Sequence, residues 1–283
     1  MNKARILFIT LKIGVFDSGY GGLTILKEIR ATLPEYDYLY LGDNARNPYG
    51  TRSFEIVYQF TLEAVKALFE RGCNLVILAC NTASAKALRS IQQNDLPLID
   101  PTKRVLGVIR PTVEILPEVS KSGHIGILAT PGTVKSLSYT IELHKLSPEM
   151  TITEHACPMW VPLVENNEID SEGADFFIRR ETQSLLKKDP EIDTVVLGCT
   201  HYPLMTHKIK QYLPDKVNIL CQGQIVAKSM KDYLKRHPEI EKTIGKNGKV
   251  HYLTTEHTEK FDSLASLFLG HPIESETISI KEK

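Results

Sequence analysis

Two cysteines stand at equivalent places in two similar stretches of the chain, LVILACNTASA at residues 75–85 and TVVLGCTHYPLM at residues 194–205. Each cysteine follows an apolar run that predicts a buried strand, and a threonine comes within two positions, where we expect a helix to begin. Backbone N–H groups at a helix start favour an anion, so a thiol there should ionise more readily than an ordinary thiol. A single such cysteine is as often a small core residue, but the matched pair, Cys80 and Cys199, favours a chemical role.

Two other chemistries are compatible with the second cysteine. Cys199 and His201 combine two types of zinc ligand and Cys80 would be the third, although the spacing differs from that of the usual paired ligands. Cys199 and His201 could also be the nucleophile and base of a hydrolase, but side chains two positions apart at a strand end are not expected to face each other. His201 could equally be an ordinary turn or core histidine.

A glycine-rich turn follows the first apolar run, in GVFDSGYGGL at residues 14–23. Such turns often hold a phosphate, but Asp17 opens this one and its carboxylate would repel an anion. The glycines spell G-x-G-G rather than G-x-G-x-x-G, and no Lys-Ser or Lys-Thr pair follows, so a nucleotide site is only weakly indicated. Gly19, Gly21 and Gly22 are expected to let the backbone approach a ligand closely.

The polar residues beside this turn and the cysteines suit a zwitterion. Uncharged hydrogen-bonding side chains and backbone N–H groups suit a carboxylate, while Asp17 supplies the charge that an ammonium group needs. The uncharged side chains belong to Ser18, Asn81, Thr82 and Thr200. The loop GDNARNPYG at residues 42–50 is a further candidate, because loops at sheet ends carry binding groups.

The composition favours a small molecule as the partner. The chain has 283 residues, 42% of them hydrophobic, which suits one large domain or two. Lys plus Arg and Asp plus Glu number 34 each, so no overall charge recruits nucleic acid or a membrane surface. Five dispersed cysteines without a CxxC pair indicate a reducing, cytoplasmic setting. No apolar run reaches 18 residues, and residues 4–19 are interpreted as a strand or short extension rather than a signal peptide.

Apolar runs alternate with amphipathic stretches along the first half of the chain. Strands are expected at residues 12–16, 36–43 and 74–80, and helices at residues 23–33 and 53–72. This alternation predicts an α/β fold with parallel sheets, which place ligands at the carboxyl ends of their strands.

The second half repeats the pattern of the first. HIGILATPGTVKS at residues 124–136 parallels KIGVFDSGYGGLT at residues 12–24. About the same length of chain separates Asp17 from Cys80 and Thr130 from Cys199, which favours duplication over chance. Two related lobes would bring all four strand ends to one cleft. The tail predicts a helix, a strand and a closing helix before a polar, frayed end at residues 274–283.

Taken together, these motifs resemble the glutamate racemase family of the cofactor-independent aspartate/glutamate racemase superfamily. The matching stretches are FDSGYGGLTILKEI, GDNARNPYG, ACNTASA, GVIRPTVE, CPMWVPLVE and LGCTHYPLM, in order from residue 14 to residue 205. The resemblance implies two pseudo-symmetric α/β lobes with mainly parallel sheets and an active site in the cleft between them. The first lobe would comprise residues 1–106 and 223–283, and the second residues 107–222.

The resemblance also assigns site residues, position by position. The implied catalytic residues are Cys80, Cys199, Asp17, His201 and Glu165. The implied substrate-binding residues are Asp17, Ser18, Tyr49, Gly50, Asn81, Thr82, Thr130, Thr133, Thr200 and His201. The sequence departs from the family pattern at Arg110, where many members have Glu, and at Pro131, and neither residue lies next to a cysteine.

The implied reaction interconverts L- and D-glutamate, with one cysteine on each face of the α-carbon, Cys199 serving the L enantiomer and Cys80 the D. It requires neither metal nor pyridoxal phosphate, and its product supplies peptidoglycan synthesis. Neither nucleic acid nor membrane is an expected partner, and a homodimer is possible. An amino-acid-binding or sensor protein on the same lobes is the alternative, although it would not need both cysteines. Aspartate racemase is the nearest rival among enzymes, and GCTHYP favours glutamate.

Overall fold

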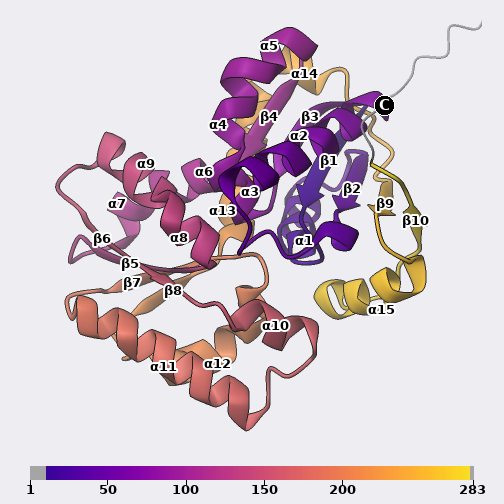
Figure 1. Ribbon diagram of the computed structural model, residues 1–283. Helices are drawn as coiled ribbons and strands as arrows, with labels where there is room; N and C mark the ends of the chain where they lie inside the picture. The colour runs from indigo at the N-terminus through magenta and orange to yellow at the C-terminus, as the bar shows by residue number, and fades with distance from the viewer. Residues whose placement is uncertain (1–10, 281–283) are drawn as a thin grey trace, which may run out of the picture.

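The computed structural model describes residues 11–280 as two α/β lobes (Figure 1). The strands are β1 (Lys12–Asp17), β2 (Tyr38–Gly42), β3 (Cys73–Leu78), β4 (Arg104–Gly107), β5 (His124–Ala129), β6 (Thr151–Ala156), β7 (Thr194–Gly198), β8 (Asn218–Leu220), β9 (Val250–Thr254) and β10 (Ser275–Thr277). The longer helices are α1 (Gly22–Thr32), α2 (Phe54–Glu70), α9 (Ser138–Leu146), α11 (Glu172–Lys188), α13 (Gln222–Arg236) and α15 (Thr258–Leu269). The short helical segments are η1 (Asn44–Arg46), α3 (Asn81–Lys86), α4 (Leu88–Ser90), η2 (Ile91–Asp95), α5 (Leu96–Ile99), α6 (Ile109–Glu114), α7 (Leu116–Val119), α8 (Pro131–Ser136), α10 (Trp160–Glu165), η3 (Tyr202–Met205), α12 (Thr206–Gln211) and α14 (Pro238–Glu241).

The strand order is the same in both lobes. Within residues 11–280, one sheet has the order β10-β9-β2-β1-β3-β4 and the other β6-β5-β7-β8. Every pairing between these strands is parallel. The segment β2-β1-β3-β4 thus corresponds to β6-β5-β7-β8, which confirms the expected pseudo-symmetry. In each lobe the next two strands of the chain lie on opposite sides of a central strand: β2 and β3 flank β1, and β6 and β7 flank β5. Ligands of open α/β sheets bind at such points.

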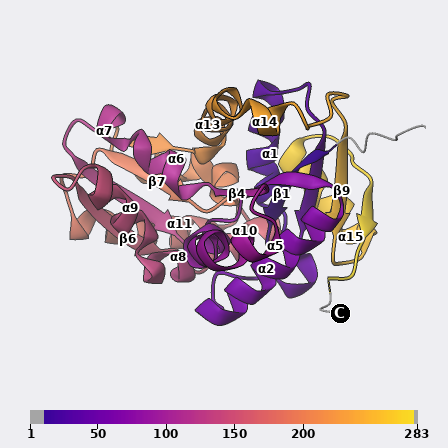
Figure 2. The same cartoon turned by 90° about the horizontal axis from the view of Figure 1, so that it is seen from above.

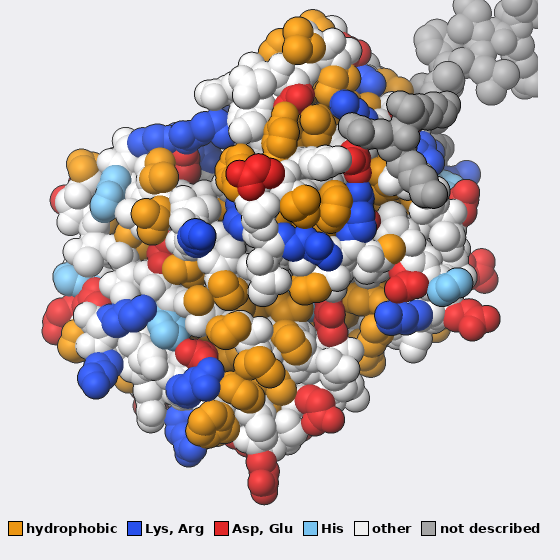
Figure 3. All heavy atoms as spheres, in the orientation of Figure 1, with side chains coloured by type: hydrophobic (Ala, Val, Ile, Leu, Met, Phe, Trp, Pro, Cys, Tyr) orange, Lys and Arg blue, Asp and Glu red, His pale blue; other side chains and the backbone are white. Residues whose placement is uncertain are grey.

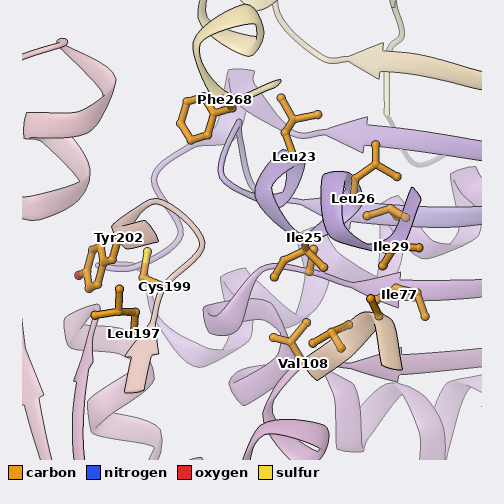
Figure 4. Packing of buried hydrophobic residues seen from close by; sticks show 14 of the residues in the cluster. Leu23, Ile25, Leu26, Ile29, Ile77, Val108, Leu197, Cys199, Tyr202 and Phe268 are labelled. Atoms are coloured by element: carbon orange, nitrogen blue, oxygen red, sulfur yellow. The ribbon is translucent and has the colours of Figure 1, made fainter. Parts of the chain in front are cut away.

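Helices cover both faces of the first sheet because its strands are apolar on both sides. Ile13 and Val15 of β1 pack toward α1, α13 and α15, whereas Phe16 packs toward α2. Figure 4 shows the first face, where Leu23, Leu26 and other α1 side chains lie over the strands. Burial on both faces fixes the strand register, since a one-residue slip would exchange the two sets of side chains.

The second sheet is covered in the same way. Ile125 and Ile127 of β5 pack with α6 and α9, and Leu128 packs on the other face with α10 and α11. Figure 2 shows the two lobes side by side, with the yellow C-terminal strands on the lobe that begins with β1. The division into residues 1–106 with 223–283 and 107–222 remains a proposal about folding units.

The structure confirms most expected elements and corrects one. In the described part of the polar end, Ser275–Thr277 is not frayed but pairs with β9 as an edge strand. The turn after Cys199 leads into a 3₁₀ helix that continues directly as α12, so a helix begins there as expected. Part of the N-terminal stretch at residues 4–19 lies outside the described residues. In the described part of the chain, no helix is long and apolar enough to cross a membrane.

Basic and acidic side chains are mixed on the face seen in Figure 3, so neither sign of charge dominates it. Blue and red side chains are interspersed there, and orange hydrophobic side chains gather toward the middle of the face. This agrees with the equal numbers of basic and acidic residues and gives no large patch suited to nucleic acid on that face.

Candidate active site

The loops after the central strands of both lobes enclose one cavity of about 320 Å³. All but two of the residues proposed for the site line it: Ser18, Tyr49, Gly50, Cys80, Asn81, Thr82, Thr130, Glu165, Cys199, Thr200 and His201. Two larger hollows of about 590 and 550 Å³ also occur among the described residues, but neither is lined by Cys80 or Cys199. The site is therefore assigned by its chemistry rather than by size.

Cys80 begins the helix that follows β3. It is the N-cap of α3, and its sulfur accepts a hydrogen bond from the backbone N–H of Ala83 at 3.5 Å. The Ser18 hydroxyl lies 3.5 Å from the same sulfur. Burial, with a smaller contribution from the nearby Asp17 carboxylate, raises the pKa of Cys80 to about 12. The expectation of an easily ionised thiol is thus wrong for Cys80, because desolvation outweighs the helix N-terminus.

Cys199 has a different neighbour, an imidazole. Its sulfur lies 3.9 Å from Nδ1 of His201, so these side chains do face each other, contrary to the expectation for residues two positions apart. The reason is that both lie beyond the end of β7, in a turn where the strand alternation no longer applies. Nε2 of His201 lies 3.0 Å from Glu165. Burial alone would lower the pKa of His201, but the contacts with Cys199 and Glu165 outweigh it and raise this pKa to about 10.

Asp17 lies behind the cavity and does not line it. Its side chain is 1% exposed, accepts a hydrogen bond from the Gly19 N–H at 2.8 Å and lies 3.3 Å from the Thr200 hydroxyl. Burial raises the pKa of Asp17, although the charge of His201 and the hydrogen bonds oppose this effect. Asp17 therefore connects the turn after β1 with the turn after β7.

The glycines of this turn serve close packing between protein segments. A Cβ on Gly21 would lie 2.2 Å from Oγ1 of Thr200 and 2.5 Å from Nδ1 of His201. A Cβ on Gly22 would lie 2.5 Å from the Asp17 side chain. Only glycine permits these approaches, because real Cβ contacts are longer. The close neighbour of Gly21 is thus the turn after β7, where a ligand was expected.

The loop after β2 contacts the second lobe through Asn47, which the sequence analysis did not name as a site residue. Nδ2 of Asn47 donates to Glu165 at 2.9 Å, and the Tyr49 hydroxyl donates to the buried Asp43 carboxylate. Tyr49 therefore holds its loop in place with its hydroxyl. Cys157, which also lines the cavity, was likewise missed. Asn47 and Asp43 lie within the loop at residues 42–50, which the sequence analysis named as a candidate binding loop. The sequence thus indicated the loop, but it did not indicate these two residues.

Three threonines form a second connection between the lobes. The Thr82 hydroxyl lies 2.9 Å from that of Thr130 and 3.3 Å from that of Thr133. Thr133 is fully buried and does not itself line the cavity. Beside them, the carbonyl oxygen of Gly50 accepts a hydrogen bond from the N–H of Gly132 at 2.7 Å. These contacts join the wall around Cys80 to the second lobe.

The zinc alternative finds no ligand set in the part of the chain that the structure describes. Across residues 11–280, no group of three or more His, Cys, Asp or Glu side chains is arranged to hold a metal ion. Arg110, which departs from the family pattern, forms exposed ion pairs with Glu114 and Glu142. Pro131 occupies the first position of α8, where proline is well tolerated.

Comparisons with known proteins agree with the resemblance seen in the sequence. Residues 23–230 match the family model described as Asp/Glu/Hydantoin racemase. A glutamate racemase of Ruegeria sp. (strain TM1040) is 40% identical, over 93% of this chain and 98% of its own. The solved glutamate racemase of Bacillus anthracis is 35% identical with a TM-score of 0.86, over 95% of this chain and 98% of its own. That of Francisella tularensis, in complex with D-glutamate, is 30% identical with a TM-score of 0.85, over 96% and 98%.

Proposed function

Because this chain belongs to the glutamate racemases of the Asp/Glu/Hydantoin racemase family, we propose that it interconverts L- and D-glutamate by proton transfer between two thiols, Cys80 and Cys199. One observation carries the proposal: thiols from equivalent strand ends of the two lobes line the same cavity. A volume of about 320 Å³ is in the range of small-molecule sites. The Francisella relative, solved with D-glutamate, supports the choice of ligand.

Racemisation needs an acid and a base on opposite faces of the α-carbon. One thiolate removes the α-proton from one face, and the opposite thiol supplies a proton to the other face. The roles exchange for the reverse reaction, so the substrate does not need to turn over in the site. With a cysteine from each lobe, the cleft can perform this transfer with residues of the chain alone.

The two thiols differ in their environments before substrate binds. The high pKa of Cys80, about 12, keeps it a neutral thiol near pH 7. His201, with a pKa of about 10, carries a positive charge at that pH and lies 3.9 Å from Cys199. An imidazolium stabilises a neighbouring thiolate. The resting site is therefore proposed to hold Cys199 as the base and Cys80 as the acid, which suits attack on the L enantiomer first.

The α-proton of an amino acid is only weakly acidic, so the developing negative charge must be stabilised. Ser18, Asn81, Thr82 and Thr200 provide uncharged donors along the cavity wall. We assign them to the substrate carboxylates. Asp17, the expected partner of the substrate ammonium group, lies behind the cavity wall. We therefore assign it an indirect role through Thr200, whose hydroxyl donates to its carboxylate. The D-glutamate product would serve peptidoglycan synthesis.

A racemisation assay tests the substrate assignment. The purified protein is incubated with L-glutamate or L-aspartate, and the loss of circular dichroism is followed over time. We expect the signal of L-glutamate to decay to zero and that of L-aspartate to persist much longer. Equal or faster decay with aspartate would overturn the substrate. Persistence of both signals, with either amino acid raising the melting temperature, would favour the amino-acid-binding alternative.

A further inference from the structure

A buried set of side chains directly behind Asn81 is not used by the chemistry described so far. It consists of Gln222, Tyr139 and Thr112, each with a side chain at most 2% exposed. These residues come from α13, α9 and α6, and α3, α6 and α13 meet near the centre of the molecule (Figure 1). The set therefore lies where segments from both lobes come together.

The hydrogen bonds within this set form a closed ring. Nδ2 of Asn81 donates to Oε1 of Gln222 at 2.6 Å, and the Tyr139 hydroxyl donates to Oδ1 of Asn81 at 2.6 Å. Nε2 of Gln222 donates to the hydroxyl oxygens of Tyr139 and Thr112, both at 2.9 Å. Each buried polar atom of the ring thus has a partner, as a buried network requires.

A backbone carbonyl sets the direction of these hydrogen bonds. Nε2 of Gln222 lies 3.3 Å from the carbonyl oxygen of Val108, which can only accept. If the Gln222 amide were reversed, its own oxygen would face that carbonyl. The Tyr139 hydroxyl already accepts from Gln222, so its single proton must go to Asn81. Burial raises the pKa of Tyr139 well above its ordinary value, which keeps that proton in place.

We propose that Gln222 and Tyr139 are positioning residues that hold the Asn81 amide in one orientation at the cavity wall. An Asn amide has two N–H groups and a carbonyl with two lone pairs. The ring uses one N–H and one lone pair, which leaves one donor and one acceptor of Asn81 for a zwitterionic substrate. Asn81 adjoins Cys80, so its orientation places substrate relative to that thiol. This inference rests on the proposed racemase function.

The test is a double-mutant cycle on kcat/KM for L-glutamate. Tyr139→Phe removes one hydroxyl from the ring, and we expect a loss of about 10-fold, mainly in kcat, because a misplaced group lowers the rate more than it weakens binding. In an Asn81→Ala background, the same substitution should cause almost no further loss. Independent, multiplicative losses would overturn the positioning role. If Gln222→Glu folds, it should behave as Tyr139→Phe does, because a carboxyl group cannot make both donations; an unchanged kcat/KM would contradict the role of Gln222.

A matched control separates positioning from general stability. Tyr38 is also a fully buried tyrosine, and its hydroxyl donates to the carbonyl of Leu33 at 2.7 Å, on the first sheet. Tyr38→Phe should lower the melting temperature about as much as Tyr139→Phe but leave kcat/KM unchanged. Equal losses of kcat/KM in Tyr38→Phe and Tyr139→Phe would overturn the proposal.

A readout without turnover distinguishes this inference from the racemase function. The side-chain amide signal of Asn81 in ¹⁵N NMR, identified by its loss in Asn81→Ala, should exchange slowly with water in the unsubstituted protein. Tyr139→Phe should speed that exchange, and Tyr38→Phe should not. If the protein failed to racemise glutamate, the proposed function would fall while this exchange would still decide the orientation of Asn81. Unchanged exchange in Tyr139→Phe would overturn it.

Discussion

At the scale of single residues, the two cysteines differ more than their matching sequences indicate. Cys80 has a serine hydroxyl and a nearby carboxylate, both in a buried setting. Cys199 has a histidine that is itself held by Glu165. Burial favours the neutral thiol at Cys80, whereas Cys199 has an imidazole beside it; this difference supports the opposite roles proposed for the two thiols. Glu165 lines the cavity and contacts His201, so we propose that it positions this imidazole.

The Glu165–His201 contact predicts a stability change that depends on pH. The pKa of His201 is raised from about 6.5 to about 10, so its contribution to stability is complete below pH 6.5 and is lost as the pH rises through 10. Glu165→Gln removes the charged partner and should lower the free energy of unfolding by about 1.5–3 kcal/mol near pH 6. The difference from the unsubstituted protein should shrink steadily toward pH 10. Urea unfolding at several pH values measures this difference.

A second histidine–carboxylate pair supplies the control. His124 lies 2.9 Å from Asp189, and its side chain is 33% exposed. Solvent screening makes such a contact weak, so Asp189→Asn should cost less stability at every pH. A difference for Glu165→Gln that did not change between pH 6 and pH 10 would contradict the assigned charge of His201.

At the scale of elements, the turn after β1 and the turn after β7 act as one unit. Asp17 and Gly21 of the first contact Thr200 and His201 of the second, across the boundary between the lobes. The Thr24 hydroxyl of α1 also donates to the carbonyl of Thr200 at 3.0 Å. The conformation of the Cys199 turn is therefore set partly by the other lobe.

Gly21→Ala tests this dependence. Its Cβ would come within 2.2 Å of Thr200 and 2.5 Å of His201, so the turn that carries Cys199 must shift. We expect kcat/KM to fall by about 100-fold, the loss typical of a misplacement near 1 Å. Gly19→Ala is the matched variant, because its Cβ would meet nothing closer than 3.4 Å. Comparable kinetics for the two variants would show that the close approach does not position Cys199.

At the scale of the whole molecule, the alternating pattern of the sequence predicted the α/β class and the paired lobes well. Apolar runs such as KIGVF became central strands because both of their faces are buried. Short-range patterns could not predict the contacts that cross the lobes, such as Asn47 with Glu165 or Asn81 with Gln222. The strand at Ser275–Thr277 was missed for a similar reason, since β9 stabilises a segment that is polar by composition.

The last prediction concerns the cleft as a whole, because it requires one base from each lobe. In deuterated water with L-glutamate, solvent deuterium should enter the D product in the first turnovers, since the opposing thiol has exchanged with solvent. The recovered L-glutamate should stay largely unlabelled, because its proton remains on the thiol that removed it. The reverse should hold with D-glutamate, and mass spectrometry of the separated enantiomers measures both.

Cysteine variants complete this test. Cys80→Ser and Cys199→Ser should each fold and each lose racemisation, because a hydroxyl is a far poorer base than a thiol near pH 7. Cys73→Ser is the control, since Cys73 is buried in β3 away from the cavity. Early deuterium in the recovered substrate at the same rate as in the product would indicate one base that serves both faces. In that case the pseudo-symmetry of the lobes would reflect duplication of the fold but would not indicate a two-base reaction.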